Sequence, residues 1–321
     1  MARAGGGDLY LETQDLTLLD SGKVTATIFA NRDQVLGLAA IAEPSLALLI
    51  GLPDAGKGQG GNVTIQADRI AVDGFNSLAP SSVSQISSIT LGSGNAGNLD
   101  ITTRELRVSG GGVVVSSSVF SILDFGAPVA GSGLGNGGNV SVRADDITLT
   151  GVNPITGLSS TLGSQTIALG NAGNTTIQTR RLWVGEGGAL LSGTFASGDG
   201  GLLDIQAQSI RVDGGDALTG QPSRLGTFAA APSAAVQRTF FVSAVPEGNT
   251  GRLVIRGDRL EITNGAQVGV AHQGFGSAGS LDFSLGSLRL ANQGQLNAAT
   301  AVVRGETSSS RSPISCYCAR L

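Results

Sequence analysis

Residues 172–195 read AGNTTIQTRRLWVGEGGALLSGTF, and the pattern in this stretch decides the fold. A small residue, a glycine and an asparagine come first. Apolar side chains then recur two positions apart, as at Leu182 and Val184, which is the period of a β-strand. Four residues separate one such pair from the next, enough chain to turn a corner. A third alternating piece follows a glycine turn, so the stretch predicts strand, corner, strand, turn and strand.

The same unit recurs eight times along the chain. Its third alternating piece is clearest at residues 23–29, 113–120, 189–195 and 266–271. The second residue of each unit is a glycine, and successive glycines lie 54, 36, 41, 35, 28, 50 and 28 residues apart. The spacing of 28 residues marks the bare unit, and the excess elsewhere predicts loops inserted at the turns. The glycines that start the units are Gly7, Gly61, Gly97, Gly138, Gly173, Gly201, Gly251 and Gly279.

A unit of three short strands cannot bury its apolar face alone, so we expect the units to stack. Each strand would then pair in parallel with its equivalent in the next unit. The fold predicted is all-β, a parallel β-helix of about eight three-strand coils with loop insertions. The inward positions of one coil are expected to be Val63, Ile65, Ile70 and Val72, whose equivalents form aliphatic ladders along the rod.

Two regions are expected along the chain. The β-helix should cover residues 1–303, and residues 304–321 break the pattern and should form an irregular tail. The first residues have no apolar segment of the kind that a signal peptide needs. Residues 35–52 are the most apolar stretch, but Glu43 and Pro44 interrupt it, so we expect no membrane span.

Composition narrows the functional class. Of 321 residues 50 are glycine, yet 40% are apolar, which is enough to bury a core. The net charge is −4 and the basic residues are scattered, so no nucleic-acid partner is expected. Cys316 and Cys318 are the only cysteines, so the body of the chain is built without thiols, as suits an exported bacterial protein.

The glycine-rich returns between units resemble a phosphate-binding loop, most closely at residues 51–61. However, Gly58 follows Lys57 where a Ser or Thr should hold magnesium, and strand period follows where a helix is needed. A nucleotide site is used once, whereas this motif recurs in the same slot. We therefore expect a repeated turn and no cofactor. The three G-x-G-x-x-G matches are Gly56-Gly58-Gly61, Gly92-Gly94-Gly97 and Gly133-Gly135-Gly138.

Glycine and asparagine at the start of each coil are the predicted structural positions. The glycine should allow a sharp corner. The asparagine after it should bridge neighbouring turns from side chain to backbone, and stack as a ladder. These positions are Gly61, Asn62, Gly97, Asn98, Gly138, Asn139, Gly173 and Asn174.

The repeats resemble those of the filamentous haemagglutinin family, the large exoproteins of bacterial two-partner secretion. The resemblance rests on the recurring G-G-N-x-x-I, L-x-V and G-A-x-V segments, as in residues 172–195, and runs from about residue 5 to about residue 300. It implies a right-handed β-helix, export through an outer-membrane transporter partner, and an extracellular or cell-surface role. Members of the family begin with a signal peptide and a secretion domain, so this chain resembles an internal or C-terminal piece.

Two short features are candidate binding sites. Arg256, Gly257 and Asp258 spell RGD, an integrin cue in some adhesins, although the same slot reads QADR at 66–69 and RADD at 143–146 and so indicates repeat drift. Trp183 is expected to point outward, either as a platform for a sugar ring or as cover for a loop.

No catalytic or metal-binding constellation is evident. Asp100, Asp204 and Asp282 should face outward, but they fall on coils three, six and eight, too far apart for a shared site. His272 is the only histidine and is expected to be an exposed strand or turn residue. The serines at 116–118 have no histidine or aspartate around them in sequence.

The sequence therefore predicts a non-enzymatic segment of a secreted or surface-exposed adhesin-like exoprotein, with surface glycans or other cells as further candidate partners. Two alternatives stay open. One is a polysaccharide-active β-helix enzyme, with a groove built by inserts at 30–59, 120–136 and 216–249. The other is a nonfunctional gene remnant.

Overall fold

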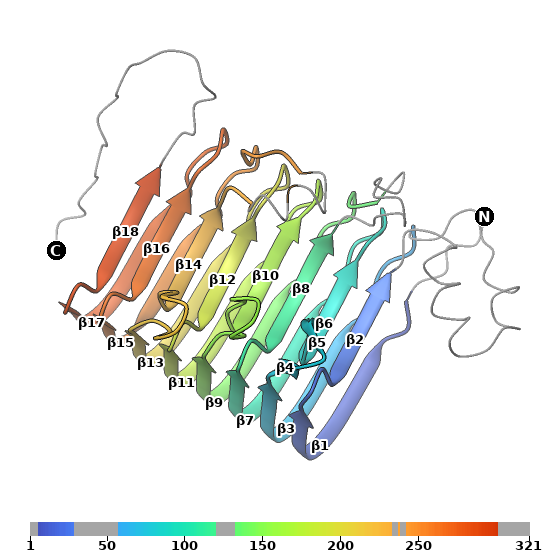
Figure 1. Ribbon diagram of the computed structural model, residues 1–321, viewed down its shortest axis with the longest axis horizontal. Coiled ribbons are helices and arrows are strands. Elements are labelled where there is room, and N and C mark those ends of the chain that lie inside the picture. The colour runs from blue at the N-terminus through green and yellow to red at the C-terminus, as the bar shows by residue number, and fades with distance from the viewer. Residues whose placement is uncertain (1–5, 29–56, 120–131, 233–236, 238–241, 301–321) are drawn as a thin grey trace, which may run out of the picture.

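A computed structural model of the chain describes residues 6–28, 57–119, 132–232, 237 and 242–300. Every element bounded within these residues is a β-strand. Two parallel sheets of eight strands each run along one axis, and the chain passes from one sheet to the other in every coil (Figure 1). The fold is a parallel β-helix, as the repeat predicted.

One sheet consists of long strands and the other of short ones. The long sheet contains β1 (Leu9–Leu18), β3 (Val63–Asp73), β7 (Leu99–Ser109), β9 (Val140–Thr150), β11 (Thr175–Gly185), β13 (Leu203–Asp213), β15 (Leu253–Thr263) and β17 (Leu281–Ala291). The short sheet contains β2 (Lys23–Ile28), β6 (Gln85–Thr90), β8 (Val113–Val119), β10 (Thr161–Ile167), β12 (Ala189–Thr194), β14 (Arg224–Ala229), β16 (Gln267–His272) and β18 (Gln295–Thr300). A small hairpin, β4 (Phe75–Asn76) with β5 (Ala79–Val83), stands outside both sheets.

Each long strand combines the first two strands predicted for a coil, joined at the corner. In the pairing of β3 with β7, Ala67 lies opposite Thr103 and Arg69 opposite Glu105, whereas Asp68 between them has no partner in the ladder. The same one-residue gap interrupts every pairing of the long sheet. The corner therefore costs one pair of ladder positions and leaves the register unchanged on both sides.

The core is a set of aliphatic ladders. Val63, Ile65, Ile70 and Val72 are at most 1% exposed, and their register partners on neighbouring coils belong to the same buried cluster. Full burial of such a side chain stabilises the fold by about 1.5–3 kcal/mol. Because each coil repeats the same inward positions, apolar contact continues from coil to coil.

The inner face of the short sheet changes from apolar to polar along each strand. On β6, Ile86, Ser88 and Thr90 are all fully buried. Ser88 Oγ accepts a hydrogen bond from the Gly97 amide at 2.9 Å, and Thr90 Oγ1 donates to the Gly94 carbonyl at 2.6 Å. The equivalent hydroxyls of Ser116 and Ser164 accept from the next coil-start amides. A buried hydroxyl layer thus satisfies backbone groups that no strand partner reaches.

Three coils carry an insertion between the long strand and the following short strand, at residues 74–84, 151–160 and 214–223. The third lies in the segment 216–249, which the sequence predicted as one long insert but which contains strand β14. The other two predicted inserts, 30–59 and 120–136, fall largely outside the described residues, as do the apolar stretch 35–52 and the tail.

Candidate binding surface

The coil-start glycines stack directly on one another. A Cβ atom on Gly97 would lie 2.0 Å from the Gly61 carbonyl oxygen, and one on Gly138 or Gly173 would lie 2.0 or 2.1 Å from the oxygen of the glycine before it. None of these four glycines has a positive φ angle. Glycine is required here for space between the coils, and not for the backbone freedom at a corner that we expected.

The asparagines that follow form a continuous ladder. The Asn98 amide donates to Asn62 Oδ1, the Asn139 amide to Asn98 Oδ1, and the Asn174 amide to Asn139 Oδ1, each at 2.9 Å. Asp8 extends the ladder at one end, because its Oδ1 accepts from the Asn62 amide at 2.7 Å. Each side chain therefore replaces a strand partner for the residue one coil away.

A second ladder runs beside the first, and the sequence reading missed it. The Asn136 amide donates to Asn95 Oδ1 at 2.9 Å, and the Asn171 amide donates to Asn136 Oδ1 at 2.8 Å. Asp199 and Asn249 continue it. The signal was present in the sequence, because asparagine occurs twice, three residues apart, in NAGN, NGGN and NAGN of three successive coils.

The G-x-G-x-x-G motif is explained by the same stacking. Its middle and last glycines occupy two separate stacks, since a Cβ on Gly94 would lie 1.7 Å from the Gly58 oxygen and one on Gly135 would lie 1.9 Å from the Gly94 oxygen. The amide of the last glycine, Gly97, is already bonded to Ser88. The motif therefore packs coils together and does not present free amides to a phosphate.

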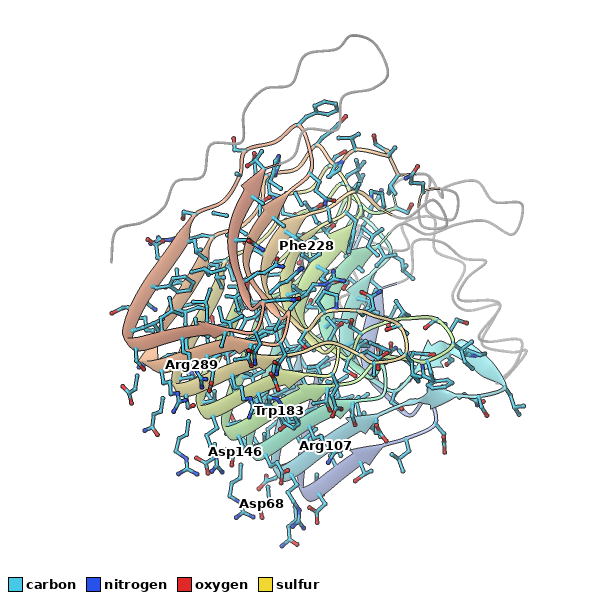
Figure 2. All side chains as sticks on the ribbon, turned by 60° about the vertical axis from the view of Figure 1, so that its left-hand side comes forward. Asp68, Arg107, Asp146, Trp183, Phe228 and Arg289 are labelled. Atoms are coloured by element: carbon cyan, nitrogen blue, oxygen red, sulfur yellow. The ribbon has the colours of Figure 1, made fainter. Side chains whose placement is uncertain are left out.

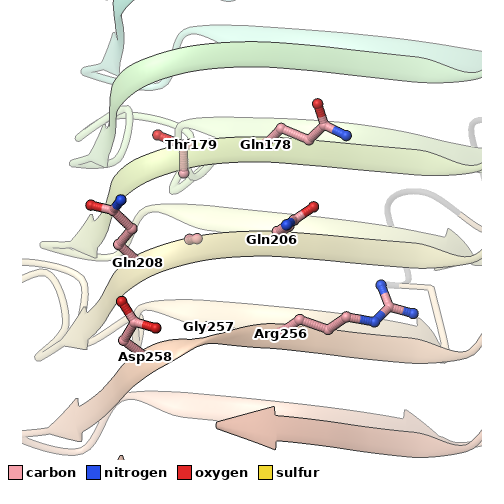
Figure 3. A pocket seen from close by; sticks show the side chains of 8 residues that line it. Gln178, Thr179, Gln206, Gln208, Arg256, Gly257 and Asp258 are labelled. Atoms are coloured by element: carbon pink, nitrogen blue, oxygen red, sulfur yellow. The ribbon is translucent and has the colours of Figure 1, made fainter. Parts of the chain in front are cut away.

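The RGD tripeptide crosses the corner of strand β15. Figure 3 shows Arg256 in a row with Gln178 and Gln206, and Asp258 in a second row with Gln208, with the smaller side chains between. Arg256 Nη1 pairs with Asp204 Oδ1 on the neighbouring coil at 2.6 Å. A Cβ on Gly257 would lie 1.9 Å from the Ala207 oxygen. The tripeptide is thus a regular part of the coil surface.

Trp183 points outward, as the alternation predicted. Its side chain is 39% exposed, and it lies between Thr148 and Arg211 in the register of the long sheet. A shallow hollow beside it is also lined by Asp146 and Arg181. Figure 2 shows that this face lies on the opposite side of the coil from the short sheet, where Phe228 is found.

Ion pairs connect neighbouring coils along the outer corner of the long sheet. Asp15 pairs with Arg69 at 2.6 Å, Asp146 pairs with Arg181, and further pairs follow the same rows. The hydrogen bond from Arg69 lowers the pKa of the Asp15 carboxyl, and the bond from Arg181 lowers the pKa of Asp146. These side chains are largely exposed, so solvent screens each pair and its contribution to stability is small.

The outward acids do not converge. Asp204 pairs with Arg256, and Asp282 pairs with Arg252 at 2.6 Å. Asp100 lies beside Thr64 and Ser141 in the register, so no second carboxylate is its ladder neighbour. Among the described residues no three side chains of the metal-binding types form a group, and Cys316 and Cys318 lie outside those residues.

His272 is buried, and the prediction that it is exposed is wrong. Its side chain is 1% exposed, and Nδ1 lies 2.7 Å from Thr250 Oγ1. It ends strand β16 in register with Ala229, at a position that faces the interior in every central coil. Ser116 and Ser118 are also fully buried, in the hydroxyl layer.

The three corner insertions share one local design. In each, an Asn or Asp side chain accepts the amide two residues later: Asn76 from Leu78, Asn153 from Ile155, and Asp216 from Leu218. The aliphatic side chains so displayed are 95%, 60% and 85% exposed. Asn153 Nδ2 also donates to the Pro80 carbonyl at 2.8 Å, which ties two of the insertions together across the coil between them.

Among the described residues, none belongs to a helix long and apolar enough to cross a bilayer. Comparisons of the chain with models of protein families, with curated proteins and with solved structures find no match.

Proposed function

We propose that this chain is a structural and interaction segment of a secreted or surface-exposed bacterial adhesin-like exoprotein, with no reaction of its own. One observation carries the proposal. The repeated polar rows of the described coils, from the asparagine ladders to the corner ion pairs, bond one coil to the next instead of meeting at a common point. Side chains arranged in this way hold a rod together and leave its long faces for contact.

Export forms part of the same proposal. It rests on the resemblance of the repeats to the filamentous haemagglutinin family, and it adds an outer-membrane two-partner secretion transporter as partner. A rod of stacked coils suits such a role because every coil contacts only its neighbours and so presents extended outer faces.

The two alternatives have less support. A polysaccharide-active enzyme needs carboxylates at a shared site, whereas Asp100, Asp204 and Asp282 lie on separate coils and two of them are paired with arginines. A gene remnant would accumulate breaks in the ladders. The described coils instead keep one register in all the long-strand pairings.

Localisation in the native bacterium tests the proposal. An antibody raised against the folded chain would be applied to intact cells, permeabilised cells and the culture medium. We expect labelling of intact cells or medium, and loss of the cell-surface signal after external protease. A pool found only after permeabilisation, together with cytosolic fractionation, would overturn the proposal.

A further inference from the structure

A hollow on the outer face of the short sheet is the most distinctive site outside the ladders. It lies over β14 and β16, has a volume of about 390 Å³, and is lined chiefly by Leu191, Arg224, Gly226, Phe228, Gln267 and Gly269. We call it the short-sheet hollow.

Two glycines form its floor. Gly226 and Gly269 lie side by side in the register, between Leu191 on one neighbouring coil and Asn297 on the other. A Cβ on Gly226 would lie 1.9 Å from the Gly269 oxygen, and one on Gly269 would lie 1.8 Å from the Asn297 oxygen. Side chains are therefore excluded from two successive coils, which leaves a depression about 10 Å long.

One wall of the hollow is apolar and fixed. The Phe228 ring covers Gly193, and its centroid lies 4.7 Å from that of Phe195 at an interplanar angle of 56°. Phe228 is 7% exposed, so the ring is held in place by its neighbours. The floor also meets the aliphatic side chain of Leu191.

The opposite wall is polar and carries a cation. Arg224 and Gln267 are register partners there, and Gln273 and Asn297 add further amide groups at the margin. Arg224 Nη2 donates to Gln221 Oε1 at 2.6 Å, and the guanidinium pairs with no carboxylate among the described residues. Burial lowers the pKa of Arg224, yet an arginine remains charged in proteins.

This combination differs from the rest of the surface. Arg181, Arg252 and Arg256 are each neutralised by an aspartate on a neighbouring coil. Arg224 is half-buried beside an apolar wall and keeps several N–H donors for an external acceptor. A partly desolvated guanidinium favours a carboxylate, which it binds in a bidentate manner.

We propose that the short-sheet hollow binds an acidic sugar, a uronate unit of a glycan. The carboxylate would pair with Arg224, the C–H face of the ring would lie against Leu191 and Phe228, and the amides of Gln267 and Asn297 would bond to hydroxyls. A fatty acid would use the cation and the apolar wall but not the amides. The inference rests on the proposed function, because it names the ligand class of an extracellular binding segment.

Titration calorimetry with digalacturonic acid tests the inference, with neutral galactobiose as the matched sugar that lacks the carboxylates. We expect saturable binding of the acid, and binding of the neutral sugar that is weaker by about tenfold or more. Arg224→Gln should reduce the affinity for the acid to that for the neutral sugar. Arg256→Gln, at an arginine on the other sheet, should leave it unchanged.

A second pair of variants keeps the test decisive if Arg224→Gln alters folding. Ala271 lines the hollow and is exposed, and Ala299 is its exposed register partner outside the hollow. Ala271→Leu should abolish binding, and Ala299→Leu should retain it. Absence of binding by the unaltered chain, or binding that both Arg224→Gln and Ala271→Leu retain, would overturn the inference. Neither result bears on localisation, so the proposed function would fail separately, on the antibody experiment.

Discussion

The backbone amide of Asn139 donates to Oδ1 of Asn98, one coil away, at 2.9 Å. This bond replaces a strand pairing at the start of the coil, and each step of the ladder repeats it. The contact spans 41 residues of sequence but a single coil of structure. The stability of the rod should therefore depend on these side chains more than their exposed position suggests.

Replacement of Asn98 tests the ladder. Asn98→Ala removes the acceptor of the Asn139 amide, so we expect the free energy of unfolding to fall by roughly 1–2 kcal/mol. Asn98→Asp keeps an acceptor oxygen, as Asp8 does in the first coil and Asp199 in the second ladder. Urea unfolding followed by circular dichroism should give a smaller loss for Asn98→Asp. Equal losses for the two variants would argue against the bond as the cause.

The glycine stack makes a sharper prediction. A Cβ on Gly138 would lie 2.0 Å from a backbone oxygen, whereas nothing lies within 4 Å of the same position on Gly7. Gly138→Ala should thus destabilise the protein by on the order of 3 kcal/mol, since the backbone of two coils must separate. Gly7→Ala occupies the same slot of the repeat and should be nearly neutral. Thermal unfolding of both variants distinguishes steric stacking from a general need for backbone freedom.

The sequence predicted the features that depend on period alone. Val63 and Ile65 alternate with polar residues, and alternation identifies one face of a strand as apolar. It does not reveal which polar residues face inward. Ser88 and Ser164 were therefore missed as core residues, because a serine that alternates with polar neighbours is normally solvated. His272 was misplaced for the same reason, since its strand is apolar at the two preceding inward positions.

The short-sheet hollow was beyond the sequence for a different reason. Strand β14 follows the corner insertion 214–223, so it lies ten residues later than the repeat predicts and was taken as part of a loop. Only the register that pairs Gly226 with Gly269 shows that two glycines from distant segments form one floor. Insertions that leave the coil intact hide such pairings from a comparison by spacing.

Acid should weaken the turn at Asp213. Burial raises the pKa of this carboxyl, but hydrogen bonds from Thr263 and Asn264 and the nearby Arg211 outweigh that effect, so the pKa lies below its usual value. A lowered pKa in the folded state gives stability that is present above the unfolded pKa of about 3.9 and is lost as the pH falls through the folded value.

The variant Asp213→Asn should therefore be less stable than the parent at pH 7, by roughly 1–2 kcal/mol, and should lose less stability between pH 5 and pH 3. Asp100→Asn is the control, because Asp100 is exposed and lies outside the ion pairs of the described coils. Urea unfolding across this pH range measures both. A parallel pH dependence of Asp213→Asn and the parent would assign the acid sensitivity to other carboxylates.

The buried hydroxyl layer makes the last prediction. Ser164 Oγ accepts from the Gly173 amide at 2.8 Å and lies 3.2 Å from the Gly138 carbonyl, so one hydroxyl serves backbone groups of two coils. On β14 the equivalent residue is Thr227, whose Oγ1 donates to the Gly251 carbonyl at 2.7 Å. A threonine therefore fits this place in a neighbouring coil, and Ser164→Thr should be tolerated.

Ser164→Val has the shape of threonine but lacks the hydroxyl, so the comparison of these two variants isolates the hydrogen bonds from the added volume. Loss of the hydroxyl leaves the Gly173 amide buried without a partner, which costs about 1–3 kcal/mol. We expect urea unfolding to show that difference between the valine and threonine variants. If both unfold at the same urea concentration, packing volume limits this site, and the hydroxyl layer would then be a consequence of the fold and not one of its supports.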